Sequence, residues 1–410
     1  MFKIDTAMEW LIFIYVGLSL VIPVASFNKL VFVGLLVLSV FLIKKVSTKL
    51  FGTVMIFAIF IYGFFLAFFT NSDMSLARQF LLTTLTLFLI IPIGEFHVDM
   101  NKVVTYAGWI LLIVDLFLVL YAIGKYDFYS EGVLQEVANW FYNFIPASWY
   151  EYIVAYGSSA AGIREIFSGK DIMVHIGSVH FLYLPTCLHF DEFLKNKKSV
   201  NLLFVLLALI AVWFSTSRAL LLMLVAMLGY LYLRNINNLP FKVIMYSFVA
   251  LIAVVLLIYL LLNTNVFSMS DGSNSIKVGH INSAIESMTF IKFLFGNGLA
   301  SHYYSMGVNR MIAHTEITYV DFCRYFGVPL ATLIFVKLIF PARGILKKLI
   351  DIKSNNYKYL IIFCGYLLMS ASNPILFNSI GTIVILWYWS KVLEENELDG
   401  GKEVRSYSGI

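Results

Sequence analysis

The residues of this chain that could do chemistry gather around one histidine. His314 stands in the run His314-Thr315-Glu316, and Asp321 and Arg324 follow it. A histidine with a carboxylate nearby is a reasonable general base, because its unperturbed pKa lies near neutrality. His314, Asp321 and Arg324 would share roughly one face of a helix that already began at His314. The spacing predicts acid–base chemistry at His314, while the simpler interpretation of Asp321 and Arg324 is an internal ion pair.

A second candidate group opens another predicted helix. Arg218 ends the run Ser215-Thr216-Ser217-Arg218. An arginine at the rim of a membrane helix commonly extends to lipid phosphate, whereas a fixed guanidinium can bind a phosphate or diphosphate through paired hydrogen bonds. Further positive or titratable groups precede His314 in the same loop: Lys277, His280, Lys292, His302 and Arg310. Only one or two of them are expected to have a functional role, since scattered charges of this kind are more often simply solvated.

Other chemistries find no support in the motifs. The sequence has no His-Glu-x-x-His, no cysteine pair and no clustered Asp-x-Asp, so it predicts no metal site. It has no Walker-type phosphate loop, which argues against an ATP-driven pump. Asp115, deep in a predicted helix, is costly in a membrane and needs a partner. A proton-coupled transporter would use such a residue, and that alternative stays open.

Composition sets the class of protein. Of 410 residues, 60% are hydrophobic and 13% are charged, whereas soluble domains are about 45–50% apolar and about 25% charged. This excludes a soluble enzyme, a disordered regulator and a nucleic-acid module, and we expect no nucleic-acid partner. Because each membrane span needs about 20 apolar residues, the chain is predicted to be an all-α polytopic membrane protein, a single integral membrane domain over residues 1–410.

Apolar windows predict about 12 transmembrane helices. They cover residues 8–26, 28–43, 50–70, 76–93, 103–124, 171–190, 200–214, 217–233, 241–263, 316–340, 358–372 and 375–392. The pair 200–214 and 217–233 is divided because one helix over both would be about 50 Å long, well beyond a hydrocarbon core of about 30 Å.

The distribution of lysine and arginine predicts the orientation. These residues are concentrated in the loops that are cytoplasmic if the N-terminus is inside, above all between Arg343 and Lys358. By the positive-inside rule both termini are then cytoplasmic. Two long loops lie outside, over 125–170 and 264–315. The first carries an aromatic run suited to the membrane interface, and the second a predicted amphipathic helix near 279–293.

Taken in order, these motifs resemble the superfamily of bacterial O-antigen polymerases and O-antigen ligases. Ser215, Ser217 and Arg218 form an S-x-S-R at a helix start. Gly296-Asn297-Gly298 forms a G-x-G in a late outside loop, and His314 precedes a helix that contains Gly327. The resemblance covers roughly residues 160–340.

The chain also departs from the family pattern. Thr315 stands where the family usually has asparagine, and Lys277 or His280 occupies a neighbourhood where an arginine is often found. Arg164 is similar to a family arginine ahead of the sixth helix.

The resemblance implies a GT-C-like glycosyltransferase of the bacterial inner membrane with its active site facing the periplasm. Its substrates would be oligosaccharide repeat units on undecaprenyl diphosphate, used without metal or cofactor, and a chain-length regulator protein would be a partner. His314 would act as the base, with Glu316 orienting its imidazole. Cationic groups would offset the charge on the departing diphosphate. The candidates are Arg218, Lys277, Arg310, His280 and Arg164.

Three functions remain at this point. The leading hypothesis is a polymerase that joins lipid-linked repeat units with inversion at the anomeric carbon. A ligase would instead transfer the glycan to lipid A core. A flippase or transporter of the same lipid-linked oligosaccharide would place charged residues, Asp115 among them, along a path through the bilayer.

Overall fold

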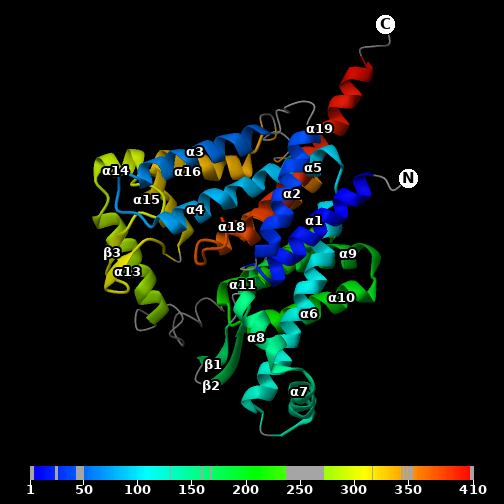
Figure 1. Ribbon diagram of the computed structural model, residues 1–410. Coiled ribbons are helices and arrows are strands. Elements are labelled where there is room, and N and C mark those ends of the chain that lie inside the picture. Colours follow the sequence, from blue (N-terminus) through cyan, green and yellow to red (C-terminus); the bar gives the residue numbers. More distant parts are fainter. Residues whose placement is uncertain are drawn as a thin grey trace. The chain divides into compact units, whose positions relative to one another are not determined.

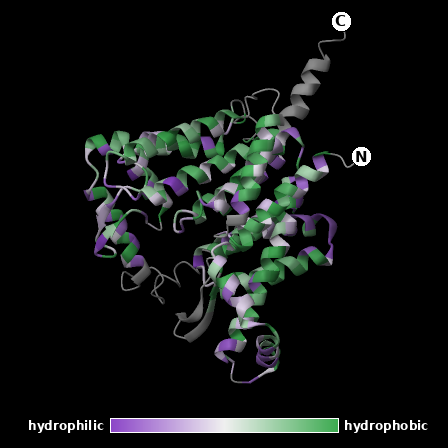
Figure 2. Ribbon diagram, in the orientation of Figure 1, coloured by the Kyte–Doolittle hydropathy of each residue, from purple (hydrophilic) through white to green (hydrophobic). Residues whose placement is uncertain are grey.

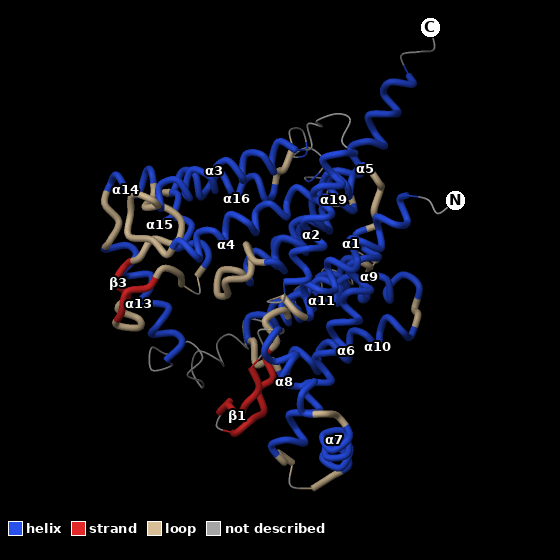
Figure 3. Tube along the Cα trace, viewed as in Figure 1, coloured by secondary structure: helices blue, strands red, loops and turns tan. Residues whose placement is uncertain are grey.

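The computed structural model describes residues 4–23, 26–42, 50–129, 131–157, 160–166, 169–236, 272–315, 317–342, 345, 349 and 354–406. Over these residues the chain is mostly helical, with two small antiparallel hairpins (Figures 1 and 3). It divides into two compact units. The first comprises Met1–Lys45, Leu89–Leu231 and Ser379–Glu394, and the second comprises Val46–Phe88, Tyr232–Asn378 and Glu395–Ile410.

Three helical segments in the described part of the chain are long and apolar enough to cross a membrane. They are Ile4–Val21, Met74–Glu95 and Met100–Tyr126. Shorter apolar helices accompany them, and hydrophobic residues occupy most of the described helices in Figure 2. The prediction of about 12 spans is therefore matched only in its coarser form, a mostly helical protein with several apolar helices.

Many helices lie where the sequence predicts them. They are α1 (Ile4–Val21), α2 (Ser26–Leu42), α3 (Phe51–Ala67), α6 (Met100–Tyr126), α10 (Ser199–Phe214), α11 (Arg218–Arg234) and α18 (Asn355–Met369). The window 76–93 corresponds to α4 (Met74–Thr84), a 3-10 turn and α5 (Ile90–Glu95), and 375–392 to α19 (Ser379–Ser406). The division of 200–233 into two helices is confirmed. The window 241–263 lies outside the described residues.

The helix predicted over 171–190 is wrong in its first half. Residues there belong to a hairpin of β1 (Ala160–Ile166) and β2 (Gly169–His175), with Ile163 opposite Ile172. Helix α9 begins only at Tyr183 and ends at Asn196. Isoleucine and valine favour a pleated strand, and β1 and β2 pair from Ile166 opposite Gly169 to Ala160 opposite His175.

The predicted outer loop 125–170 is largely structured as well. It contains α7 (Val133–Phe144) and α8 (Ala147–Tyr156). Buried Gln135 donates to Ile123 O at 3.2 Å and accepts from Tyr129 N at 2.8 Å, which fixes α7 against the end of α6. Trp140 and Trp149 are exposed.

The helix predicted over 316–340 is two helices, α15 (Thr318–Phe326) and α16 (Val328–Ile339). Gly327 between them has φ +77°, a conformation that favours glycine. A Cβ there would lie 2.5 Å from Leu294 O, so no larger residue fits. Pro329 then lies in the first turn of α16, where it needs no helical hydrogen bond.

The second long loop carries the elements that build the site. They are α13 (Gly272–Glu286), α14 (Phe290–Phe295), β3 (Tyr303–Ser305) and β4 (Arg310–Ile312). Helices α13 and α14 replace the single amphipathic helix predicted near 279–293. Figure 1 shows these elements beside α15 within the second unit.

An aromatic core holds α15 against α3 in the second unit. The Phe60 ring lies 4.9 to 5.8 Å, centroid to centroid, from Phe322, Phe326 and Phe377. All four rings are buried, and close aromatic pairs add to the free energy gained by burial. This packing gives α15, and the residues just before it, a fixed support.

The predicted G-x-G element explains how the loop joins that core. Asn297 N donates to Arg324 O at 2.8 Å, and Gly298 N donates to Tyr325 O at 3.0 Å. Gly296 and Gly298 both have positive φ, and a Cβ on Gly298 would collide with the backbone of α3 near Ala67. Glycine is therefore required because two backbones meet here without side chains between them.

Candidate functional site

A buried carboxylate lies at the centre of the site. Asp321 is in the first turn of α15 and is 1% exposed. Its Oδ2 accepts hydrogen bonds from the Thr315 backbone N–H at 2.7 Å and the Thr315 hydroxyl at 3.0 Å. Its Oδ1 accepts from Arg324 at 2.9 Å. Both oxygens are thus satisfied, which a buried carboxylate requires.

His314 lies beside this carboxylate. Its Nδ1 is 2.9 Å from Asp321 Oδ2, an ion-pair distance, although the two atoms are not aligned as a hydrogen bond. The imidazole packs edge-on against Phe80 of α4, with 5.8 Å between ring centroids, and a third of the side chain is exposed. The ring is therefore held on one side by the protein and remains accessible to a substrate.

Arg324 forms the other half of the cluster. The side chain is 4% exposed and paired with Asp321. A second guanidinium nitrogen donates to Ser301 O, and the group lies 3.7 Å from the centre of the Tyr303 ring. Burial raises the pKa of Tyr303 to about 12, so the ring is a neutral phenol near neutrality. These contacts compensate the buried charge and fix its orientation.

Thr315 shapes the turn that brings His314 to Asp321. Its buried hydroxyl accepts from Ile317 N at 2.9 Å while its backbone N–H binds Asp321. The helix begins at Thr318 and not at His314, so the condition for the three residues to share one helical face is not met. The predicted proximity is nevertheless confirmed, because the turn achieves what the helical spacing was expected to achieve.

Glu316, predicted to orient the imidazole, lies outside the described residues. The carboxylate found next to His314 is that of Asp321, whose spacing in the sequence favoured Arg324 as its partner. Both interpretations of Asp321 apply at once, because its two oxygens face different partners.

The other cations predicted in this loop lie in the same unit with different surroundings. His280 is buried on α13, and its Nδ1 is 2.6 Å from Ser305 Oγ, a contact that ties α13 to β3. Lys277 is half-buried on α13, and Arg310 is exposed at the start of β4. Of these, Arg310 is the most accessible to an anion.

Arg218 and Arg164 belong to the first unit. Arg218 is exposed at the first residue of α11. The turn before it is ordered by Ser217 N, which donates to Ser215 Oγ at 3.3 Å, and by His180 Nε2, 3.2 Å from Ser217 Oγ. Arg164 is in β1, opposite Asp171, and its side chain lies outside what is described.

Sequence reasoning missed Ser301 and Tyr303, which hold the Arg324 guanidinium. Neither forms a motif with Arg324 along the chain, because they reach it through the tertiary fold. Among the described residues no group of three or more histidine, cysteine or acidic side chains could hold a metal ion. The arrangement can instead take up and release a proton at an accessible imidazole supported by a carboxylate.

Comparison with known proteins finds no family model, no curated protein and no solved structure that matches this chain. The resemblance to O-antigen polymerases and ligases therefore remains a hypothesis that rests on the motifs at Arg218, Gly296 and His314.

Proposed function

We propose that the protein is a glycosyltransferase of the polymerase type, which moves a growing glycan from undecaprenyl diphosphate onto another lipid-linked repeat unit. The observation that carries the proposal is the 2.9 Å approach of His314 Nδ1 to buried Asp321. A base oriented by a carboxylate is what deprotonation of a sugar hydroxyl requires. The substrate class comes from the motif resemblance.

The reaction proceeds in one displacement. His314 takes the proton of the acceptor hydroxyl as that oxygen attacks the anomeric carbon of the donor. The bond from that carbon to the phosphate oxygen breaks, and the diphosphate leaves with the electron pair, so the configuration inverts. Asp321 orients the imidazole and stabilises the imidazolium that forms. Glu316 remains a predicted second carboxylate next to this base.

The departing diphosphate needs cationic partners. Arg218, Lys277 and Arg310 are proposed for this role, with His280 and Arg164 as the weaker candidates. His280 is the weakest, because it is buried against Ser305.

The setting is proposed to be the bacterial inner membrane. Three helices of suitable length and composition support membrane association. The finer topology, with about 12 spans, cytoplasmic termini and a periplasmic site, rests on the apolar windows and the distribution of lysine and arginine. A chain-length regulator is proposed as a partner from the resemblance alone.

Reconstitution tests this function. Purified protein in lipid nanodiscs with a lipid-linked repeat unit is expected to form a ladder of products without any other protein. His314→Ala should abolish the ladder and leave protein abundance unchanged. His97, an exposed histidine with φ +47°, provides the control, since His97→Asn keeps a residue that tolerates this backbone. Normal ladders from the His314 variant contradict the proposal, and transfer only to lipid A core indicates a ligase.

One observation favours transport as a second candidate. Asp115 of α6 is 0% exposed, and neither carboxylate oxygen has a hydrogen-bond partner among the residues that the structure describes. An isolated carboxylate in a membrane helix needs a proton or a cation, as a coupled transporter provides. Flipping of the lipid-linked unit by the reconstituted protein, without ladder formation and lost in Asp115→Asn, would support this function over the polymerase.

A further inference from the structure

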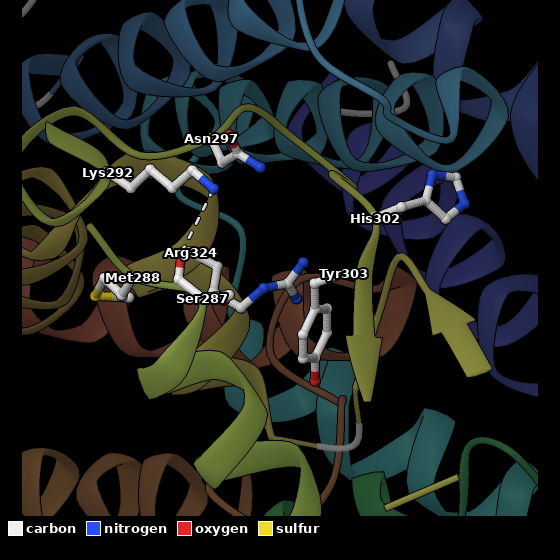
Figure 4. A pocket seen from close by; sticks show the side chains of 7 residues that line it. All are labelled: Ser287, Met288, Lys292, Asn297, His302, Tyr303 and Arg324. Carbon is white, nitrogen blue, oxygen red and sulfur yellow. Dashed lines mark hydrogen bonds between the residues drawn. The ribbon is translucent and has the colours of Figure 1, made fainter. Parts of the chain in front are cut away.

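Arg324, which pairs with Asp321, also lines a small pocket. Its volume is about 40 Å³. The walls come from the end of α13, from α14, from the G-x-G element, from β3 and from α15, and they include Ser287, Lys292, Asn297, His302, Tyr303 and Arg324. Figure 4 shows Lys292 extending across the pocket from α14 and the Arg324 guanidinium next to the Tyr303 ring, while the His302 ring points away from the others.

The pocket is positively charged. Its lining contains lysine, histidine and arginine and no acidic side chain. The charge of Arg324 is balanced by Asp321. Lys292 Nζ donates to Ser287 O over 3.4 Å, a long hydrogen bond to a neutral group, and in the described part of the chain no carboxylate lies within ion-pair distance of it. A half-buried ammonium without a counter-ion favours an anionic ligand.

The size of the pocket limits what that ligand can be. A water molecule occupies roughly 10–15 Å³ on the same measure, so about 40 Å³ has room for one small polar group. A phosphoryl or carboxylate group fits, whereas a sugar ring does not. The pocket can thus receive one charged group of a larger molecule whose remainder lies outside.

The Arg324 guanidinium and the backbone segments that carry Lys292 and Asn297 are held in place before any ligand arrives. The Asn297 backbone is bonded to Arg324 O at 2.8 Å, and Arg324 is fixed by Asp321, Ser301 and Tyr303. Thr289 Oγ1 accepts from Lys292 N at 3.4 Å at the start of α14. Donors that are carried on a fixed support lose less conformational freedom when they bind an anion.

We propose that this pocket is a binding site for a single oxyanion, held by Lys292, Arg324 and the side-chain amide of Asn297. The oxyanion is a phosphoryl group of a lipid carrier or the carboxylate of an acidic sugar. Arg324 also binds Asp321, and Asp321 lies against His314, so two residues connect the anion to the proposed base. The inference rests on the pocket and holds whether or not the protein transfers glycans.

Chemical protection of Lys292 tests the site. The full chain in nanodiscs is treated briefly with an amine-acetylating reagent, and acetylation of each lysine is measured by mass spectrometry against rising inorganic phosphate, pyrophosphate or glucuronate, with ionic strength held constant by chloride. Lys125, an exposed lysine of α6, is the internal control. We expect saturable protection of Lys292 and none of Lys125. Protection by phosphate or pyrophosphate identifies a phosphoryl ligand, and protection by glucuronate alone identifies a carboxylate.

Two variants separate this inference from the proposed reaction. Asn297→Ala removes one donor and should raise the anion concentration for half-protection about tenfold, the loss of roughly 1.4 kcal/mol of binding. His314→Ala should leave the protection unchanged. Protection of Lys292 in the unsubstituted protein, if that protein forms no glycan ladder, would reject the glycosyltransferase and keep the pocket. Equal labelling of Lys292 at all anion concentrations, or equal protection of Lys125, would overturn the oxyanion site.

Discussion

Two buried aspartates, one in each unit, have opposite surroundings. Asp321 receives hydrogen bonds from Thr315 and Arg324 and lies 2.9 Å from His314. Asp115 is equally buried, yet in the described part of the chain both of its oxygens lack a hydrogen-bond partner. The same residue type therefore holds neighbouring groups in place in one unit, and has unsatisfied hydrogen-bond acceptors in the other. Burial alone does not reveal which role a carboxylate has; its donors do.

The largest effect is expected from Asp321→Ala. The substitution leaves Arg324 as an uncompensated buried charge and frees the Thr315 donors, so it should lower the free energy of unfolding by about 3–5 kcal/mol. Chemical denaturation in detergent, followed by tryptophan fluorescence, measures this. Asp115→Ala is the matched control in the other unit and should cost less, since it breaks no hydrogen bond. If both variants lost the same free energy of unfolding, the hydrogen bonds of Asp321 would not account for a difference in stability between the two aspartates.

A smaller effect is expected from Thr315→Val, which removes one hydroxyl and nearly preserves shape. The backbone N–H of residue 315 still binds Asp321, but the hydroxyl's hydrogen bond to the charged carboxylate is lost, about 1.5–3 kcal/mol, and so is its bond from the Ile317 N–H. Thr315→Ser keeps that hydroxyl and should retain most of the stability. The same denaturation experiment ranks the three proteins. A valine variant as stable as the serine variant would show that the Thr315 hydroxyl does not stabilise the buried Asp321.

The smallest effect is expected from Asp115→Asn. With no hydrogen bond to lose, the change should alter the free energy of unfolding by less than about 1 kcal/mol, and Asp115→Leu should be neutral or stabilising. Urea denaturation in the same detergent measures both. A loss comparable to that of Asp321→Ala would mean that a proton or bound cation pairs with Asp115 and contributes to stability, which would sharpen the case for transport.

Local patterns in the sequence predicted much of the fold. The uniform apolar windows at α1, α3, α6 and α10 are helices, because such runs depend little on distant residues. The window 171–190 fails since an apolar run does not distinguish a strand from a helix by periodicity. The window 316–340 fails at Gly327, where the Gly-Val-Pro sequence signals a break that hydropathy does not register.

The site divides in the same way. His314, Asp321 and Arg324 were identified from spacing, since all three lie within one turn and one short helix. Their support by Phe80, Ser301 and Tyr303 depends on tertiary packing, which no local spacing encodes. The pocket at Lys292 could not be predicted for a related reason: a lysine in a solvated loop and a lysine that lines a pocket look alike in the sequence.

The crossing of Gly296 against Gly327 has a consequence for how this protein can vary. A Cβ on Gly296 would collide with the peptide that follows Tyr325, and one on Gly327 would collide with the peptide after Leu294. Each methyl group would enter the other backbone, so no second-site change nearby can make room for it. The join between α14 and α15 is consequently closed to gradual change, while the aromatic residues around it can be exchanged for others of similar volume. Substitutions can therefore accumulate in the side chains around this site, whereas the two positions where the backbones meet must remain glycine.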